Sequence, residues 1–82
     1  MWHELKIKDC YYEQIVDEIK TFEIRYNDRG FQKDDCIKFF EEDGSFERFG
    51  EWKITYVHSG YGLAENFVIL GIKRKKAANE RT

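Results

Sequence analysis

A ten-residue stretch, 20–29, reads KTFEIRYNDR and concentrates side chains that can bind charged or polar ligands. It holds three cations, two carboxylates, a threonine and an asparagine. At the two-residue period of a β-strand, Thr21, Glu23 and Arg25 fall on one face, opposite Phe22 and Ile24. A hydroxyl, a carboxylate and a guanidinium on one surface, with Lys20 just before them, predict a binding site. The alternative is that Glu23 and Arg25 pair with neighbours on a solvated sheet face.

Aromatic and polar residues near this stretch extend the candidate site. A guanidinium holds phosphate through charge-assisted hydrogen bonds, and an aromatic ring offers a stacking surface for a base. His3 lies on the same side of its strand as Leu5 and Ile7, so a hydrogen-bonded core histidine is the other interpretation. Tyr61 lies between two glycines and either covers a ligand or belongs to a plain connection. The candidate ligand-binding residues are His3, Lys20, Glu23, Arg25, Tyr26, Asn27, Arg29 and Tyr61.

Hydrophobic periodicity predicts the elements that position these residues. An amphipathic helix is expected from an N-cap at Asp9 to about Lys20. Residues 26–30 and the pair Asp43-Gly44 have turn chemistry. The last strand is apolar at every side-chain position, which predicts burial on both faces. The expected strands are residues 2–8, 21–25, 35–42, a fourth through Trp52, Ile54, Tyr56 and His58, and 67–72.

Length and composition predict one domain. The 82 residues suffice for one small core, and 17% aromatic content supplies the apolar area. One helix after the first strand, followed by four more strands, predicts an α+β, mainly β, five-stranded curled sheet partly closed by the helix. We expect the domain to span residues 1–73 and a basic, frayed tail to span 74–82. Residues 73–82 carry a net charge of +4 and the remainder −6, which disfavours generic nucleic-acid binding.

The remaining features set expectations about environment and cofactors. No apolar run approaches the roughly 20 residues of a membrane span, so we expect a cytoplasmic protein without a membrane partner. Cys10 and Cys36 are expected to be free thiols. The acids of the predicted hairpin, Glu41, Glu42, Asp43 and Glu47, have no spacing that fixes a coordination geometry. We therefore expect no metal and no other cofactor.

Several segments together resemble small bacterial and phage proteins of the ASCH (activating signal cointegrator homology) superfamily. The segments are 3–7, 20–25 with 27–29, Phe31 and Asp35, and Gly62-Leu63 before 67–70. The resemblance extends to about Ile72. It implies a PUA-like five-stranded pseudobarrel with a helix after the first strand, and a cleft at the end of that helix for RNA or a nucleotide. It places the family's lysine at Lys20 and its closing arginine at Arg25. A glycine that commonly precedes this lysine is replaced by Glu18-Ile19, and a Gly-Asp turn by Asp34-Asp35.

Three functions fit these observations. The first is an RNA- or nucleotide-binding module with its cleft between the end of the helix and residues 20–29. The second is an acidic protein-interaction domain that uses the hairpin around Asp43. The third follows from the resemblance to ASCH amidohydrolases that act on acylated cytidine, with Lys20 and Glu23 as tentative catalytic residues. The threonine expected three residues after Lys20 is Glu23, so the sequence favours a protein that is not an enzyme.

Overall fold

Alternating apolar residues build five strands whose buried side chains face a single core. The computed structural model describes residues 1–76. The elements are β1 (Trp2–Ile7), α1 (Asp9–Val16), β2 (Phe22–Tyr26), β3 (Cys36–Glu41), β4 (Glu51–Ser59) and β5 (Phe67–Lys75). The prediction of a mainly β, α+β fold, with five strands curled into a pseudobarrel and one helix after the first strand, is confirmed.

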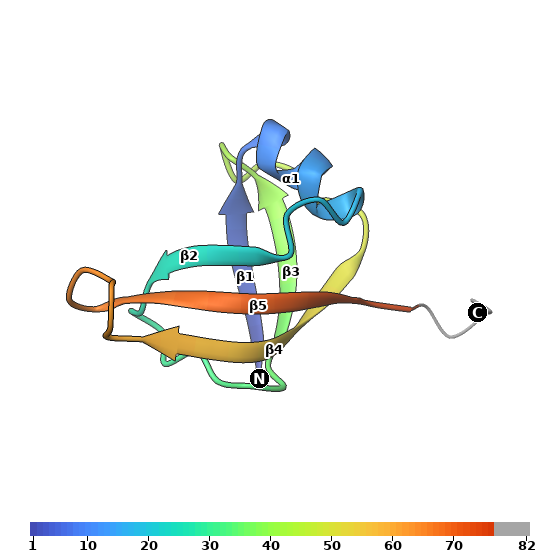
Figure 1. Cartoon of the computed structure of the whole chain (residues 1–82). Helices are drawn as coiled ribbons and strands as arrows, with labels where there is room; N and C mark the ends of the chain where they lie inside the picture. The colour runs from blue at the N-terminus through green and yellow to red at the C-terminus, as the bar shows by residue number, and fades with distance from the viewer. Residues whose placement is uncertain (77–82) are drawn as a thin grey trace.

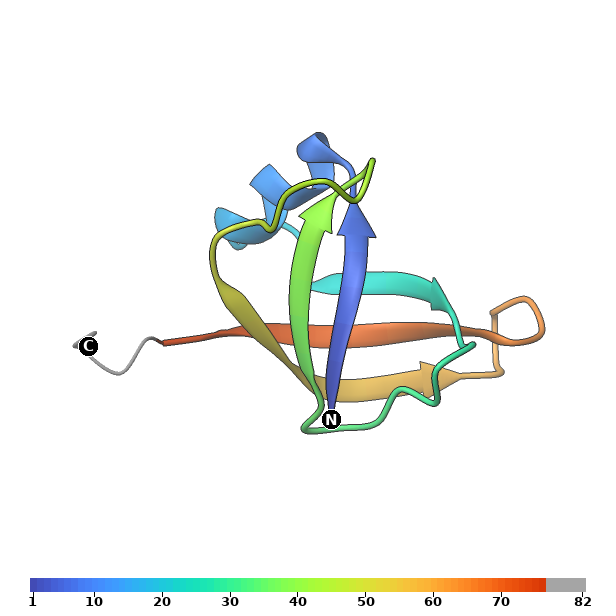
Figure 2. The same ribbon diagram turned by 180° about the vertical axis from the view of Figure 1, so that it is seen from behind.

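The strand order is β1-β3-β4-β5-β2, so β1 and β2 are the two edges of the sheet. Strands β1 and β3 are parallel, and the other neighbours are antiparallel. Figure 1 shows β2, β5 and β4 as one layer, with β1 and β3 crossing behind it. Figure 2 shows the same crossing from behind, with β1 and β3 nearest the viewer. The sheet thus curls over its own core and brings its edge strands toward each other.

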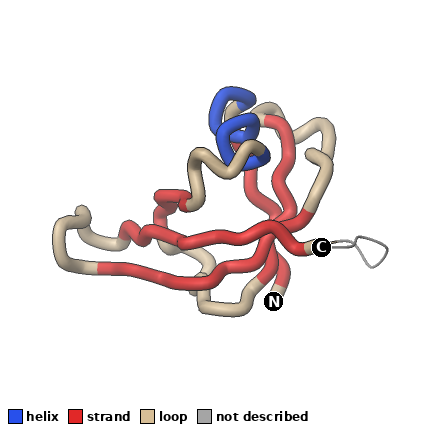
Figure 3. Tube along the Cα trace, turned by 45° about the vertical axis from the view of Figure 1, so that its right-hand side comes forward, coloured by secondary structure: helices blue, strands red, loops and turns tan. Residues whose placement is uncertain are grey.

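The core lies between these two layers, and the helix closes one end of it (Figure 3). Alternation places Ile37 and Phe39 of β3 inward, both fully buried. The helix contributes the buried Ile15 and the half-buried Tyr12. The buried apolar residues are Leu5, Ile7, Ile15, Phe31, Ile37, Phe39, Trp52, Ile54, Val68, Leu70 and Ile72.

The helix is shorter than its periodicity predicts. It ends at Val16, and Glu18 then adopts a left-handed conformation with φ 60°. The amide nitrogens of Ile19 and Lys20 both donate to the carbonyl oxygen of Gln14, which turns the chain back toward the sheet. Asp9 is the first helical residue and not the N-cap, a position held by Lys8 without a side-chain cap bond.

Strands β4 and β5 also depart from the expected alternation. A β-bulge between Ile54 and Tyr56 reverses the faces of β4, so Tyr56 lies outside the core. Only one face of β5 is buried, because Phe67 is exposed and Ile69 is partly exposed. β5 also continues to Lys75, three residues beyond the expected strand, so residues 74 and 75 of the expected tail belong to the sheet. The expected tail beyond residue 76 lies outside the described residues.

Candidate functional site at the seam between β1 and β2

Strand β2 turns its charged face toward the interior and its apolar face toward solvent. Glu23 is 4% exposed, whereas Ile24 and Tyr26 are each 53% exposed. In the antiparallel pair with β5, Glu23 lies opposite Leu70, a fully buried residue. Directly opposed residues share a face of the sheet, so the polar face of β2 is continuous with the core and is not a solvated surface.

Glu23 is the centre of a buried ion-pair cluster. Its Oε1 accepts a hydrogen bond from Arg25 Nη2 at 3.0 Å, and its Oε2 accepts one from Lys20 Nζ. Lys20 Nζ also lies 4.8 Å from the ring centroid of Tyr11 and 5.2 Å from that of Phe22. A carboxylate shielded from water is costly unless it is paired, and the two cations supply that pairing. The cluster therefore explains why a charged strand face can be buried here.

Two arginines bridge the seam where the edges β1 and β2 meet. Arg25 Nη2 donates to the carbonyl oxygen of Lys6 at 2.8 Å, and Arg29 Nη1 donates to that of Glu4 at 2.6 Å. Both acceptors belong to the edge strand β1. The guanidinium groups thus satisfy carbonyls on an edge strand and cover an edge that would otherwise be open.

A groove of about 370 Å³ runs along this seam. Its walls carry three cations and two carboxylates, and one of these carboxylates, Glu23, is already paired inside the cluster. The groove also carries two tyrosines, one from the helix and one from β2. The lining residues are Lys6, Ile7, Lys8, Tyr11, Glu23, Ile24, Arg25, Tyr26 and Glu42.

Four of the eight predicted site residues meet at the seam. Lys20, Glu23 and Arg25 form the ion-pair cluster, and Arg29, in the turn after β2, donates to β1. Tyr26 borders the groove from the outer face of β2, where its ring lies edge-on to Phe67 at 5.6 Å. Strand parity and turn chemistry are the sequence signals that found this group.

The other three predicted residues have different surroundings. His3 is buried, with Nε2 2.8 Å from Asp35 Oδ2 and its ring 4.6 Å from that of Phe31. This arrangement is that of a hydrogen-bonded core histidine. Asn27 Oδ1 accepts from the Phe31 amide at 3.1 Å and shapes the turn. Tyr61 is 95% exposed in the loop between β4 and β5.

Sequence reasoning missed Lys6, Lys8 and Tyr11 as groove residues. Lys6 and Lys8 occupy the polar positions of the first strand, and parity alone could have placed them on the face opposite Leu5. Tyr11 stands outside the expected apolar stripe of the helix. Its place beside Lys20 depends on the turn after Val16, which the sequence did not reveal.

Asp35 is the second buried carboxylate that the structure pairs. The hydrogen bond from His3 is the main cause that lowers the pKa of Asp35 below its ordinary value. Hydrogen bonds from the Gln32 amide and the terminal amino group of Met1 lower this pKa further, and burial opposes them. The carboxylate ties the amino terminus, β1 and the start of β3 together, so its role is structural.

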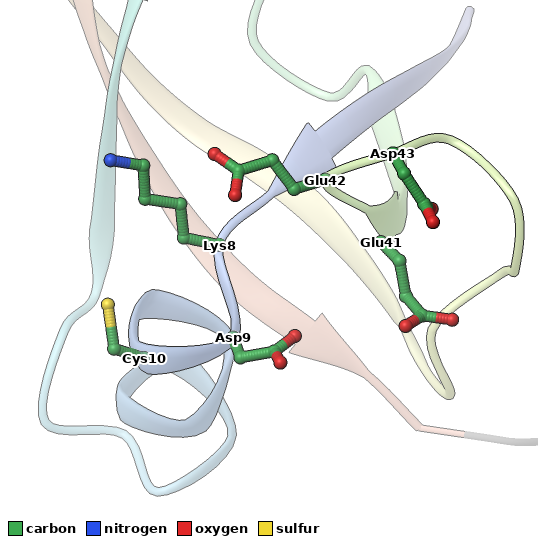
Figure 4. A pocket seen from close by; sticks show the side chains of 6 residues that line it. All are labelled: Lys8, Asp9, Cys10, Glu41, Glu42 and Asp43. Atoms are coloured by element: carbon green, nitrogen blue, oxygen red, sulfur yellow. The ribbon is translucent and has the colours of Figure 1, made fainter.

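An acidic pocket of about 690 Å³ lies at the start of α1 (Figure 4). In Figure 4 Glu42 points toward Lys8, while Glu41 and Asp43 point to the opposite side. Asp43 Oδ1 accepts from the amide and the hydroxyl of Ser45, and these bonds lower the pKa of Asp43. Across residues 1–76, no group of three or more His, Cys, Asp or Glu side chains is placed to hold a metal ion.

Two further expectations concern the cysteines and the membrane. Cys10 and Cys36 are free, as predicted, and Cys36 Sγ accepts from Lys75 Nζ at 3.4 Å. Within the part of the chain that the structure describes, no helix is long and apolar enough to cross a membrane.

The fold and the seam together define a small curled-sheet domain with a polar, aromatic-bordered groove between its edge strands. The chain belongs to the family described as "Domain of unknown function (DUF3850)", whose family model matches residues 2–72. The match covers every strand except the last three residues of β5. A search of curated proteins found no match to the chain.

Proposed function

We propose that the seam groove binds one unpaired nucleotide, as a free nucleotide or as part of a single-stranded RNA. The observation that carries the proposal is the combination of three cations with two tyrosines around one groove. Cations recognise phosphate, and aromatic rings stack on bases that have left a duplex. The resemblance to the ASCH superfamily points to the same class of ligand.

The groove offers separate contacts for the phosphate and for the base of a nucleotide. Lys6 of β1 and Lys8, the residue between β1 and α1, supply positive charge for the phosphate. Tyr11 and Tyr26 supply ring faces for the base. Glu42 forms no ion pair within residues 1–76, so its carboxylate is available to accept a hydrogen bond from a base amino group.

The ion-pair cluster gives this groove its shape more than its charge. The charge of Glu23 neutralises that of one of the two cations that contact it, and Arg25 also donates a hydrogen bond to the Lys6 carbonyl oxygen. The charge available to a ligand is therefore small. We expect weak binding that falls as salt rises, with a slope of roughly −0.7 in log K per log salt for each phosphate neutralised.

An NMR titration of labelled protein with the four nucleoside monophosphates tests the proposal. Amide shifts are expected around Lys6, Lys8, Tyr11 and Tyr26. Lys8→Ala is expected to weaken binding several-fold, since it removes a phosphate contact and no core contact. Lys53→Ala is the matched control, because Lys53 pairs with Asp34 at 3.2 Å outside the groove. Shifts that spare the groove, or equal losses in both variants, would reject the proposal.

A further inference from the structure

The outer face of the β2–β5–β4 layer carries a continuous apolar and aromatic surface. The register places Phe22, Gly71 and Tyr56 in one row across the three strands. The next row is Ile24, Ile69 and His58, and the third pairs Tyr26 with Phe67. We call this surface the aromatic face and define it by Phe22, Ile24, Tyr26, Tyr56, Phe67 and Ile69.

The aromatic face is open to solvent. Tyr56 is 62% exposed, and every other member is at least partly exposed. In Figure 1 the three strands face the viewer and no other described element covers them, since α1 lies beyond one edge. Gly71 adds no side chain at the centre, where a Cβ would stand 3.2 Å from Thr55 Oγ1 and 3.3 Å from Tyr56 Cβ. Soluble proteins rarely expose so many adjacent apolar side chains unless the surface binds a partner.

A basic surface continues from the aromatic face along the same strands. Lys53 and Lys73 lie opposite each other in the register, and Lys75 follows on β5. A groove of about 420 Å³ passes between these side chains. It is lined by five cations and one carboxylate, Asp34, which pairs with Lys53. This local excess of positive charge contrasts with the net charge of −2 of the whole chain.

The basic surface also has an aromatic ring of its own. Trp2 lies opposite Cys36, which in turn lies opposite Lys53, so Trp2 belongs to the same row. Trp2 is 52% exposed, and Lys75 Nζ lies 4.8 Å from the centroid of its ring. The aromatic face and the basic surface therefore lie end to end along β5, with Trp2 as the ring at the basic end. Together they follow β5 for roughly 26 Å, at about 3.3 Å per residue from Phe67 to Lys75.

We propose that this surface is a platform for an extended single-stranded nucleic acid. Unpaired bases stack on Tyr56, Phe67 and Tyr26, while Lys53, Lys73 and Lys75 neutralise the phosphates. The positive charge of the groove favours a nucleic acid over an apolar protein surface, since such a protein surface gains nothing from a lysine-lined groove. Stacking and phosphate contacts read no base edges, so the platform is tolerant of sequence.

The platform extends beyond the seam groove and does not depend on nucleotide binding there. The two sites meet at β2, because Ile24 and Tyr26 belong to the aromatic face and also border the groove. A strand anchored by one nucleotide in the seam can therefore cross β2 and continue over the outer face. Mononucleotides test the seam alone, and longer strands test the platform.

Fluorescence anisotropy with labelled eight-nucleotide strands of uridine and of deoxythymidine tests the platform. Tyr56→Ser is expected to weaken binding of these strands about tenfold, because one stacking ring is lost. It is expected to leave mononucleotide binding unchanged. Lys73→Ala is expected to make the salt slope shallower by about 0.7. Tyr61→Ser is the matched control, an exposed tyrosine that lies outside this face.

The outcomes separate the two proposals. Loss of strand binding in Tyr56→Ser but not in Tyr61→Ser supports the platform, and the tighter of the two strands shows whether it prefers RNA or DNA. Unchanged strand binding in Tyr56→Ser, or no strand binding by the wild type, overturns the platform even where mononucleotides bind the seam. Sedimentation of the wild type and of Tyr56→Ser tests whether a second copy of this chain occupies the surface instead. A wild-type dimer that Tyr56→Ser converts to monomers, with strand affinity unchanged, would also overturn the platform.

Discussion

Replacing Glu23 with glutamine is expected to destabilise the domain severely. The substitution keeps the size of the side chain but removes the charge that pairs with Lys20 and Arg25. Both cations are largely shielded, with side chains 15% and 23% exposed, and Glu23 is 6% exposed. Breaking a fully buried pair costs about 3–5 kcal/mol, and the partial exposure of the cations reduces this to about 2–4 kcal/mol.

This cost is large compared with the stability of so small a domain. At about 0.05–0.15 kcal/mol per residue, a chain of this length is stable by roughly 4–12 kcal/mol. Urea denaturation of the wild type and Glu23→Gln gives the difference by linear extrapolation, with an unchanged slope expected. Glu47→Gln is the matched control, since Glu47 is 59% exposed and its pair with Lys38 is 3.4 Å long. That surface pair is worth about 0–1 kcal/mol.

The result that would refute the reasoning is a Glu23→Gln variant within about 0.5 kcal/mol of the wild type. Such a result would mean that Lys20 and Arg25 find water or another partner without cost. The same variant also tests the link between stability and binding. Because it frees Arg25 from its carboxylate, it is expected to bind mononucleotides more tightly at low salt, although the folded state is less stable.

Two further predictions concern the Asp35 carboxylate and the residue Glu18 after the end of α1. The pKa of Asp35 is lowered in the folded state, so its stabilisation is present above the unfolded-state pKa and is lost as pH falls through the folded-state pKa. Urea midpoints measured from pH 5 down to pH 2, a range that spans the ordinary aspartate pKa of about 3.9, should fall less steeply in Asp35→Asn, and parallel curves would contradict this. Glu18→Gly should stabilise the domain by about 0.5–1 kcal/mol, because glycine adopts the left-handed conformation without strain. The control is Glu13→Gly in the helix interior, which should lower the stability by about 1 kcal/mol. Both variants are measured by thermal unfolding, and a loss of stability in Glu18→Gly as well as in Glu13→Gly would contradict the strain argument.

Much of the fold follows from local patterns in the sequence. Alternation in β3 predicted the inward positions of Ile37 and Phe39, and both are fully buried. The Asp43-Gly44 pair predicted the tight turn after β3, where the Gly44 amide donates to the Glu41 carbonyl at 2.7 Å. These features depend on neighbours two to four residues apart, and such interactions are visible in a sequence.

Other features depend on contacts between distant segments. The bulge at residues 54–56 places Tyr56 on the outer face, and no residue in the sequence marks it. The helix ends at Val16 because the chain must turn toward β2, although the apolar pattern continues to Ile19. His3 finds Asp35 only because β1 and β3 pair in parallel with His3 opposite Ile37.

The sequence by itself determined that β2 has one charged face and one apolar face, and that Lys20, Glu23 and Arg25 lie together. Only the tertiary structure decided which of these faces is buried. By hydrophobicity alone, Phe22 and Ile24 belong inside. The charged face lies inside because Lys20 and Arg25 neutralise Glu23 and because Arg25 reaches the Lys6 carbonyl across the seam. This arrangement leaves the apolar side chains of β2 on the outer surface, where they adjoin those of β4 and β5.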